Sequence, residues 1–169
     1  MGAPVRRDHL FHQRLIPLLV EGIGASSYVE FGSNRNETIG SVRCERRYGV
    51  DTHPVIMPGI EFFTMTTQQF IAEPAARLAP FDVVFIDAYH SAEAVRADFF
   101  GIIDHVAPEG LVLLHDTNPE TVVDTHSGLC GDAWKFAEEL KREQYEAVTL
   151  PLHPGLTIIR NRQSWGPQL

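Results

Sequence analysis

Cysteine is scarce in this chain. Only Cys44 and Cys130 occur among its 169 residues, and neither belongs to a Cys-x-x-Cys pair. Two isolated cysteines cannot form the disulfide framework that stabilises small secreted domains. We therefore expect two reduced thiols and a cytoplasmic protein, because reducing compartments keep cysteine in the thiol form.

Long apolar runs and clusters of positive charge are also missing. The stretch Leu15–Val20 is apolar, but it is short and contains Pro17, so it is neither a signal peptide nor a membrane span. The chain has 14 Lys and Arg against 22 Asp and Glu, a formal net charge of −8. Its longest basic clusters are Arg6-Arg7 and Arg46-Arg47, whereas nucleic-acid surfaces need many clustered cations. We therefore expect neither a nucleic acid nor a membrane as partner.

Two phosphate-binding fingerprints are absent as well. The sequence contains neither G-x-G-x-x-G nor G-x-x-x-x-G-K-[ST], the turns that bind dinucleotides and ATP. Only Gly32 follows the first expected strand, with Asn34 and Asn36 at later positions. Asp51 ends the second expected strand, where an acid can accept hydrogen bonds from ribose hydroxyls. NAD and ATP are therefore disfavoured, while a nucleoside ligand without a pyrophosphate remains open.

Short apolar runs alternate along the chain with segments of helical periodicity. Hydrophobic residues make up 44% of the sequence, enough for one domain with a substantial core. Expected strands cover residues 28–31, 47–51, 60–63, 83–87, 111–115, 147–150 and 156–160; expected helices cover 8–22, 66–78, 91–106 and 131–142, and a further helix opens at 36–39.

This order of elements predicts an α/β fold of the Rossmann-like, doubly wound kind. We expect a mostly parallel seven-stranded sheet with helices on both faces. The last two strands are joined so briefly that they should form an antiparallel hairpin. One domain should span residues 1–169, with an N-terminal helix within 1–24, a polar loop at 117–129 that can act as a lid, and a loose tail at 161–169.

The stretch from Phe81 to Asn118 reads as strand, crossover helix and second strand, a βαβ unit. Each strand ends in polar groups, Asp87 and His90 after the first, and His115 and Asp116 at the second. Because ligands bind beyond the carboxyl ends of parallel strands, these four side chains are our candidates for chemistry.

Two kinds of chemistry remain open for this group. Asp87 and Asp116 can hold a hard cation such as Mg²⁺ through oxygen ligands, and an added imidazole would suit a softer metal. Without a metal, His115 or His90 can act as the general base that removes a hydroxyl proton, with Asp116 beside it. A purely structural reading is that Asp116 caps the loop and His115 fills the strand end.

Several motifs, in order, resemble those of class I S-adenosylmethionine-dependent methyltransferases. Residues 28–34, YVEFGSN, are similar to motif I of that family, and residues 48–51, YGVD, to its second-strand acidic motif. Residues 81–90, FDVVFIDAYH, resemble the strand-four motif of a small-molecule O-methyltransferase group, and residues 108–116 continue the pattern. The resemblance covers residues 26–160, and the third glycine of motif I is Asn36 here.

The resemblance implies a cofactor, S-adenosylmethionine, and a set of residues that bind it. Glu30 and Gly32 would lie near its methionine part, Asp51 would bind the ribose, and Met65 and Thr66 would lie by the adenine. The full implied set is Glu30, Gly32, Asn34, Asn36, Asp51, Met65, Thr66 and Asp87. Asp87 would lie near the amino group or a metal, and Mg²⁺ or another divalent ion at Asp87 and Asp116 would be a second cofactor.

We therefore predict methyl transfer to a small-molecule acceptor, at a hydroxyl oxygen of a sugar or secondary metabolite (EC 2.1.1.-). The chain is nearly bare core fold, so a homodimer is expected to help cover the substrate. Two alternatives stay open. One is a methyltransferase-like domain that binds a ligand without transferring a methyl group. The other is a metal-dependent enzyme built on Asp87, His90, His115 and Asp116, which we call the His/Asp cluster.

Overall fold

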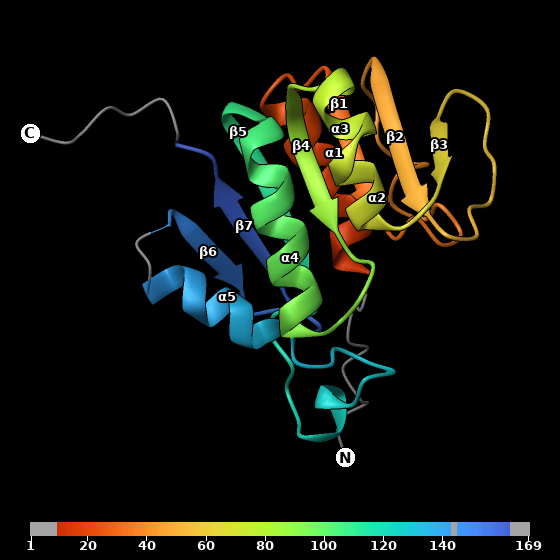
Figure 1. The fold of residues 1–169 in the computed structure, drawn as a ribbon. Coiled ribbons are helices and arrows are strands. Elements are labelled where there is room, and N and C mark those ends of the chain that lie inside the picture. The colour runs from red at the N-terminus through yellow and green to blue at the C-terminus, as the bar shows by residue number, and fades with distance from the viewer. Residues whose placement is uncertain (1–9, 143–144, 163–169) are drawn as a thin grey trace, which may run out of the picture.

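The computed structural model describes residues 10–142 and 145–162, which form one seven-stranded sheet with helices on both faces (Figure 1). The strand order is β3-β2-β1-β4-β5-β7-β6. The strands are β1 Ser27–Phe31, β2 Arg46–Asp51, β3 Glu61–Thr64, β4 Phe81–Ile86, β5 Val106–His115, β6 Ala147–Leu150 and β7 Leu156–Arg160. Strands β1 to β5 pair in parallel, and β7 runs antiparallel to both β5 and β6. The predicted fold class is confirmed, including the antiparallel C-terminal hairpin.

The helices divide between the two faces of the sheet (Figure 1). They are α1 Phe11–Gly22, α2 Thr67–Ala72, α3 Pro74–Leu78, α4 Ala92–Ile102 and α5 Ala133–Arg142, with short 3-10 turns η1 Ile103–His105 and η2 Val123–Thr125. None of those helices combines the length and the apolar character that crossing a membrane requires.

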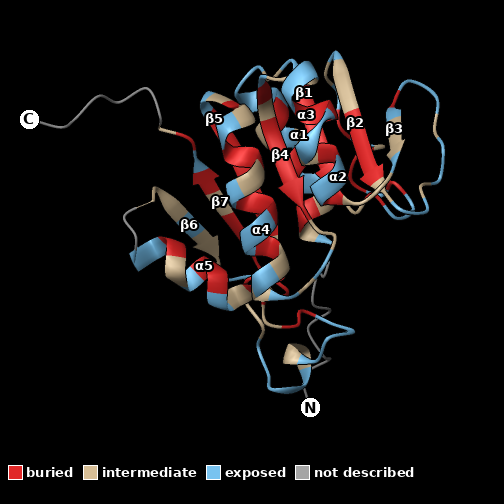
Figure 2. Cartoon of the chain, in the orientation of Figure 1, coloured by how far each residue is buried: buried red, intermediate tan, exposed pale blue. Residues whose placement is uncertain are grey.

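Alternating side chains along the central strands build two hydrophobic cores. Val84 and Ile86 of β4 pack in the core that Phe99 of α4 shares, whereas Val83 and Phe85 pack in the core that Ile16 of α1 shares. Figure 2 shows the buried residues concentrated in these strands and on the inner faces of the helices. Each buried Phe or Leu stabilises the fold by about 1.5–3 kcal/mol, so the central strands are the rigid frame on which the site rests.

The expected helix at 36–39 is wrong. In the described residues between β1 and β2 the chain forms turns, not a helix. Asn34 and Asn36 both have positive φ, at 43° and 65°, a conformation that asparagine tolerates better than most residues but that breaks a right-handed helix.

The expected helix at 66–78 is two helices. Pro74 begins α3 as its first residue, and the chain turns at Glu73, since a proline inside a helix clashes with the preceding turn. The helix at 91–106 is also shorter than expected, and β5 begins already at Val106. Of the expected loose tail, residues 163–169 lie outside the described residues, while Asn161 is buried and its side chain donates to the Val106 carbonyl at 2.8 Å.

Candidate functional site

The four polar residues expected at the carboxyl ends of β4 and β5 do lie together. The register pairs Ile86 with Leu114, so the residues that follow them, Asp87 and His115, are neighbours. His115 Nδ1 lies 2.9 Å from Asp87 Oδ1 and 3.4 Å from Asp116 Oδ2. His90 reaches the same group from the loop before α4, with Nδ1 at 3.1 Å from Asp116 Oδ2.

A fifth residue, His12 of α1, was not among the sequence candidates. Its Nδ1 lies 3.1 Å from His115 Nε2, and the two rings meet edge to face with centroids 4.2 Å apart. His12 is only 5% exposed, and it shares the buried face of α1 with Ile16 and Val20 at spacings of four residues. That spacing was the available signal, because a polar residue on the apolar face of a helix needs a partner.

The charges of this cluster are strongly coupled. Burial alone would lower the pKa of His115, but the neighbouring carboxylates of Asp87 and Asp116 outweigh it and raise that pKa to about 10. Burial would raise the pKa of Asp116, but the imidazoles of His115 and His90 hold it below its usual value. His115 is therefore an imidazolium between two carboxylates at neutral pH.

Three of these side chains could hold a metal ion. Ligand atoms of Asp87, His90 and Asp116 all lie within 4.8 Å of one another. Asp116 is 5% exposed, and its Oδ2 accepts no hydrogen bond of ordinary geometry from the described residues. Two carboxylates and one imidazole suit a divalent cation, with the nitrogen favouring a softer ion than Mg²⁺.

A cavity of about 230 Å³ opens at the carboxyl ends of β1, β2 and β3. Its walls include Gly32, Asp51, Met65 and Thr66, four of the residues implied for the cofactor. Gly32 has φ +85°, and a Cβ there would lie 2.4 Å from the Asp87 carbonyl, so the close approach of the two strand ends requires glycine.

Glu30, Asn34 and Asn36 do not line this cavity. Glu30 is buried and accepts a hydrogen bond from the Tyr28 hydroxyl at 2.5 Å; burial raises its pKa well above the usual range. Asn36 donates through Nδ2 to the Val55 carbonyl, and so helps to shape the turn. Asp51 accepts the Asn34 N–H at 3.0 Å and the His53 N–H at 2.8 Å, which fixes its carboxylate at the rim.

A second cavity, of about 500 Å³, adjoins the first, and Tyr89 is in the wall of both. His90, Trp134 and Lys135 also line it. Trp134 also lines a third cavity, of about 660 Å³, beside the segment 117–125. The buried Trp134 Nε1 and Thr117 Oγ1 have no hydrogen-bond partner among the described residues. Three cavities thus lie along the carboxyl edge of the sheet, and His90 lines the second of them.

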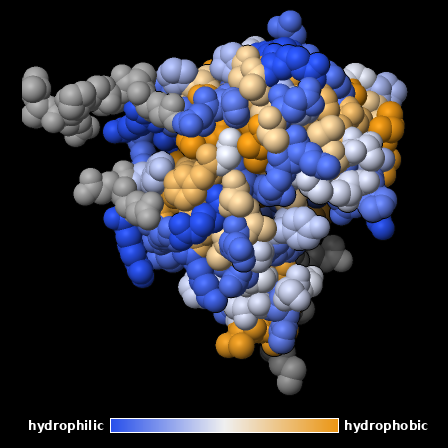
Figure 3. Space-filling view, in the orientation of Figure 1, coloured by the Kyte–Doolittle hydropathy of each residue, from blue (hydrophilic) through white to orange (hydrophobic). Residues whose placement is uncertain are grey.

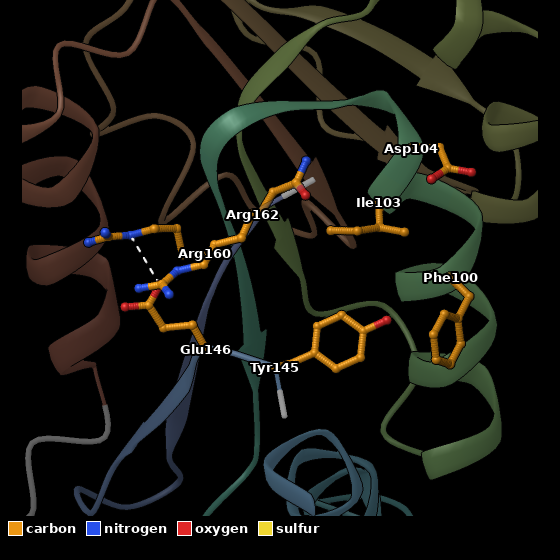
Figure 4. Close-up of a pocket in the computed structure, with 8 residues that line it drawn as sticks. Phe100, Ile103, Asp104, Tyr145, Glu146, Arg160 and Arg162 are labelled. Carbon is orange, nitrogen blue, oxygen red and sulfur yellow. Dashed lines mark hydrogen bonds and ion pairs between the residues drawn. The ribbon is translucent and has the colours of Figure 1, made fainter. Parts of the chain in front are cut away.

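A further cavity of about 600 Å³ lies at the opposite end of the sheet (Figure 4). Arg160 and Arg162 line it near Glu146, with which both form ion pairs, and Tyr145 and Phe100 are also in its wall. Its cations are already paired with this acid, and it is far from the strand ends where ligands bind in such folds. We therefore assign the functional site to the carboxyl edge.

Comparison with known proteins identifies the family and the fold. A family model described as a methyltransferase domain matches residues 29–117. A 46-residue segment is 44% identical to a demethylmacrocin O-methyltransferase from Streptomyces fradiae, covering 27% of this chain and 12% of that protein.

Solved structures share the fold. An O-methyltransferase from Bacillus cereus in complex with SAH has a TM-score of 0.66 and 18% identity, over 94% of this chain and 84% of that one. The MycE methyltransferase of the mycinamycin pathway, in complex with Mg, SAH and mycinamycin VI, has a TM-score of 0.63 and 18% identity, over 81% of this chain and 44% of that one. The chain thus spans less than half the length of MycE and about an eighth of the Streptomyces protein.

Proposed function

From the premise that this chain belongs to the methyltransferase domain family, we propose that it transfers a methyl group from S-adenosylmethionine to a hydroxyl of a small molecule. The observation that carries the proposal is the pair of cavities that share Tyr89. One is lined by four of the eight residues implied for the cofactor, and the other is lined by His90 of the His/Asp cluster. Donor and acceptor would therefore meet at the ends of β4 and β5.

The residues of the first cavity fit the cofactor. Two backbone N–H groups hold the carboxylate of Asp51 in place, and this carboxylate can still accept hydrogen bonds from a ligand. Gly32 leaves the strand ends free of side-chain bulk, and Met65 supplies an apolar wall. When bound, S-adenosylmethionine supplies a methyl group already activated by its sulfonium, so the protein's main tasks are alignment and removal of the acceptor proton.

His90 fits the role of general base better than His115. Both nitrogens of His115 are engaged, Nδ1 by Asp87 and Nε2 by His12. A base needs an unprotonated nitrogen that faces the substrate, and an imidazolium with a pKa near 10 has none at neutral pH. We assign His115 to holding Asp87 and Asp116 in place, and His90, which lines the second cavity, to receiving the proton.

A divalent cation is a second component of this proposal. The MycE structures contain Mg, and the carboxylates of Asp87 and Asp116 would hold such an ion here, which leaves Nε2 of His90 for the proton. When bound, it would supply positive charge that lowers the pKa of a hydroxyl next to it. The local feature that supports the site is the buried Oδ2 of Asp116, which lies next to two imidazoles but accepts no hydrogen bond of ordinary geometry from the described residues.

For the acceptor we propose a hydroxyl of a sugar or secondary metabolite. Support comes from the second and third cavities, where aromatic rings of Tyr89 and Trp134 stand among hydroxyl groups such as that of Thr125. Such a mixed lining suits a ring that carries several hydroxyl groups. Two of the similar proteins also have small molecules in their names, demethylmacrocin for the Streptomyces enzyme and mycinamycin VI for the MycE complex.

Calorimetric titration tests the function directly. Purified protein, treated with a chelator, is titrated with S-adenosylmethionine and then with S-adenosylhomocysteine, with and without added Mg²⁺. We expect micromolar affinity for both. The absence of binding under either condition would contradict the proposal, and binding of metal alone would favour a metal-dependent enzyme of different chemistry.

Turnover separates catalysis from mere binding. Formation of S-adenosylhomocysteine is followed with a panel of hydroxylated acceptors, for the wild type and for His90→Gln, with His105→Gln as the control at the other end of β5. We expect His90→Gln to bind the cofactor and to lose turnover. If no acceptor is methylated despite tight cofactor binding, the non-catalytic binding domain becomes the better reading.

A further inference from the structure

One nitrogen of the His90 ring, Nδ1, lies next to two hydrogen-bond acceptors. Its Nδ1 makes a hydrogen bond with the Leu129 carbonyl and lies 3.1 Å from Asp116 Oδ2. A carbonyl oxygen has no proton and can only accept a hydrogen bond from the ring nitrogen. Nδ1 must therefore carry the hydrogen.

The other ring nitrogen is left without a hydrogen-bond partner within the described part of the chain. Asp87 Oδ1 lies 3.8 Å from Nε2, which is beyond hydrogen-bond distance. In neutral His90 the lone pair is then on Nε2, which is the atom that can accept a proton or bind a cation.

The Leu129 carbonyl is held by a closed turn. The Leu129 and Gly131 N–H groups both donate to the His126 carbonyl, at 2.9 and 3.1 Å, and the Cys130 N–H donates to the Asp124 carbonyl at 2.9 Å. The direction of the Leu129 carbonyl is thus set by its own backbone, not by a side chain that can rotate.

The same segment also holds the backbone of His90. The N–H groups of Asp132 and Ala133 donate to the His90 carbonyl at 2.9 and 3.1 Å, and the Ala92 N–H donates to Asp132 Oδ1 at 2.7 Å. Residues 129–133 therefore fix His90 from two sides, at its ring and at its main chain.

Gly131 makes this contact possible. It has φ +57°, and a Cβ at this position would lie 2.1 Å from the His90 carbonyl oxygen. A side chain cannot fit there unless segment 129–133 or the His90 loop moves. By contrast, a Cβ on Gly128, three residues earlier in the same loop, would meet nothing within 4 Å.

We propose that segment 129–133 is a positioning device for His90. The Leu129 carbonyl selects the tautomer with hydrogen on Nδ1, which presents the bare Nε2 to the site, and Gly131 is the positioning residue that allows the approach. The catalytic consequence rests on the proposed function, but the tautomer does not. The segment that lines the second cavity also orients the base, so displacement of this segment would release the ring of His90 from its single tautomer.

The tautomer can be measured without any activity assay. In uniformly ¹⁵N-labelled, metal-free protein at a pH where His90 is neutral, long-range ¹H–¹⁵N spectra distinguish protonated from bare ring nitrogens. The His90 signals are assigned by their loss in His90→Gln. We expect a protonated Nδ1 and a bare Nε2. The opposite tautomer, or rapid exchange between the two, would overturn the proposal.

Gly131→Ala then tests the positioning role, with Gly128→Ala as the matched control. We expect Gly131→Ala to lose the single tautomer and to lower kcat roughly tenfold to a hundredfold with little change in cofactor affinity, because small displacements of a reacting group have effects of that size. Gly128→Ala should leave both unchanged. An unaltered tautomer and kcat in a folded Gly131→Ala protein would contradict us, and if that variant fails to fold, the wild-type spectrum decides.

The two proposals fail in different ways. Loss of the expected tautomer in a protein that binds S-adenosylmethionine would remove the positioning device and leave the function standing. The expected tautomer in a protein that binds no S-adenosylmethionine would leave the device and remove its catalytic meaning.

Discussion

The imidazolium of His115 couples the stability of the protein to pH. In the metal-free protein its pKa is raised to about 10, against about 6.5 in an unfolded chain, by the carboxylates of Asp87 and Asp116. A raised pKa means that the folded state holds this proton more tightly than the unfolded state. The stabilisation is then complete below about pH 6.5 and disappears as the pH rises through about 10.

We therefore expect the free energy of unfolding of the chelated protein to fall by a few kcal/mol between pH 6.5 and 10. Urea denaturation at several pH values measures this. His115→Gln should be less stable at pH 6.5 and should lose most of the slope over that range. An equal slope in wild type and variant would show that other groups carry the pH dependence.

A second prediction at the residue scale concerns Asp51 and the affinity for S-adenosylmethionine. Asp51→Ala should weaken S-adenosylmethionine binding by about 1–3 kcal/mol, the range for hydrogen bonds to a charged group. Calorimetry measures it, and His53→Ala serves as control because His53 is an exposed neighbour in the same loop. Unchanged affinity in Asp51→Ala would mean that the ribose does not reach this carboxylate.

At the scale of elements, Asp132 joins the start of α5 to the start of α4. Its Oδ1 accepts the Ala92 N–H at 2.7 Å, so it satisfies one of the N–H groups that a helix leaves open at its first turn. Asp132→Ala should lower the free energy of unfolding by about 0.5–2 kcal/mol, as loss of a helix cap does. Urea denaturation is again the measurement.

Lys135→Ala is the matched control for this prediction. Lys135 pairs with Asp132 at 3.1 Å, but Lys135 is exposed and Asp132 is partly exposed, and such surface pairs contribute little. If Lys135→Ala costs as much stability as Asp132→Ala, the ion pair and not the cap is the source of the effect.

The elements that the sequence predicted well are those whose signal is local and periodic. The strands around Val83–Ile86 and Leu111–Leu114 are continuous apolar runs, and their polar ends locate the site in a parallel sheet. The terminal hairpin, 147–150 with 156–160, was predicted at its observed bounds. Because these two strands are parallel neighbours in the sheet, their polar ends lie close together.

The missed features depend on backbone states or on distant partners. Turns replace the helix at 36–39 because Asn34 and Asn36 adopt positive φ, which composition does not reveal. His12 lies 103 positions before His115, so only the packing of α1 on the sheet brings them together. The contact between Leu129 and His90 likewise comes from a segment that reads in sequence only as a polar loop.

At the scale of the whole molecule, the cavities and the charged cluster share one edge of the sheet, beside a segment that is poorly covered. Figure 2 shows the chain after β5 as mostly exposed. Its Val122 and Val123 side chains are 83% and 63% exposed, and Figure 3 shows hydrophobic surface at this end of the molecule. Exposed apolar groups beside a site are typical of surfaces that another chain covers.

We therefore expect a homodimer in solution in which this segment contacts the partner. Light scattering after size exclusion measures the mass. Replacing Val122 and Val123 together by Lys should shift the mass to that of a monomer and leave S-adenosylmethionine binding intact, since neither residue lines the first cavity.

Val148→Lys is the matched control for the dimer. It is 58% exposed on β6, at the far edge of the sheet, and should leave the mass unchanged. A wild-type monomer would contradict the expected dimer. In a monomer the contact between Leu129 and His90 would still orient the base, and Gly131→Ala should lower turnover there as well.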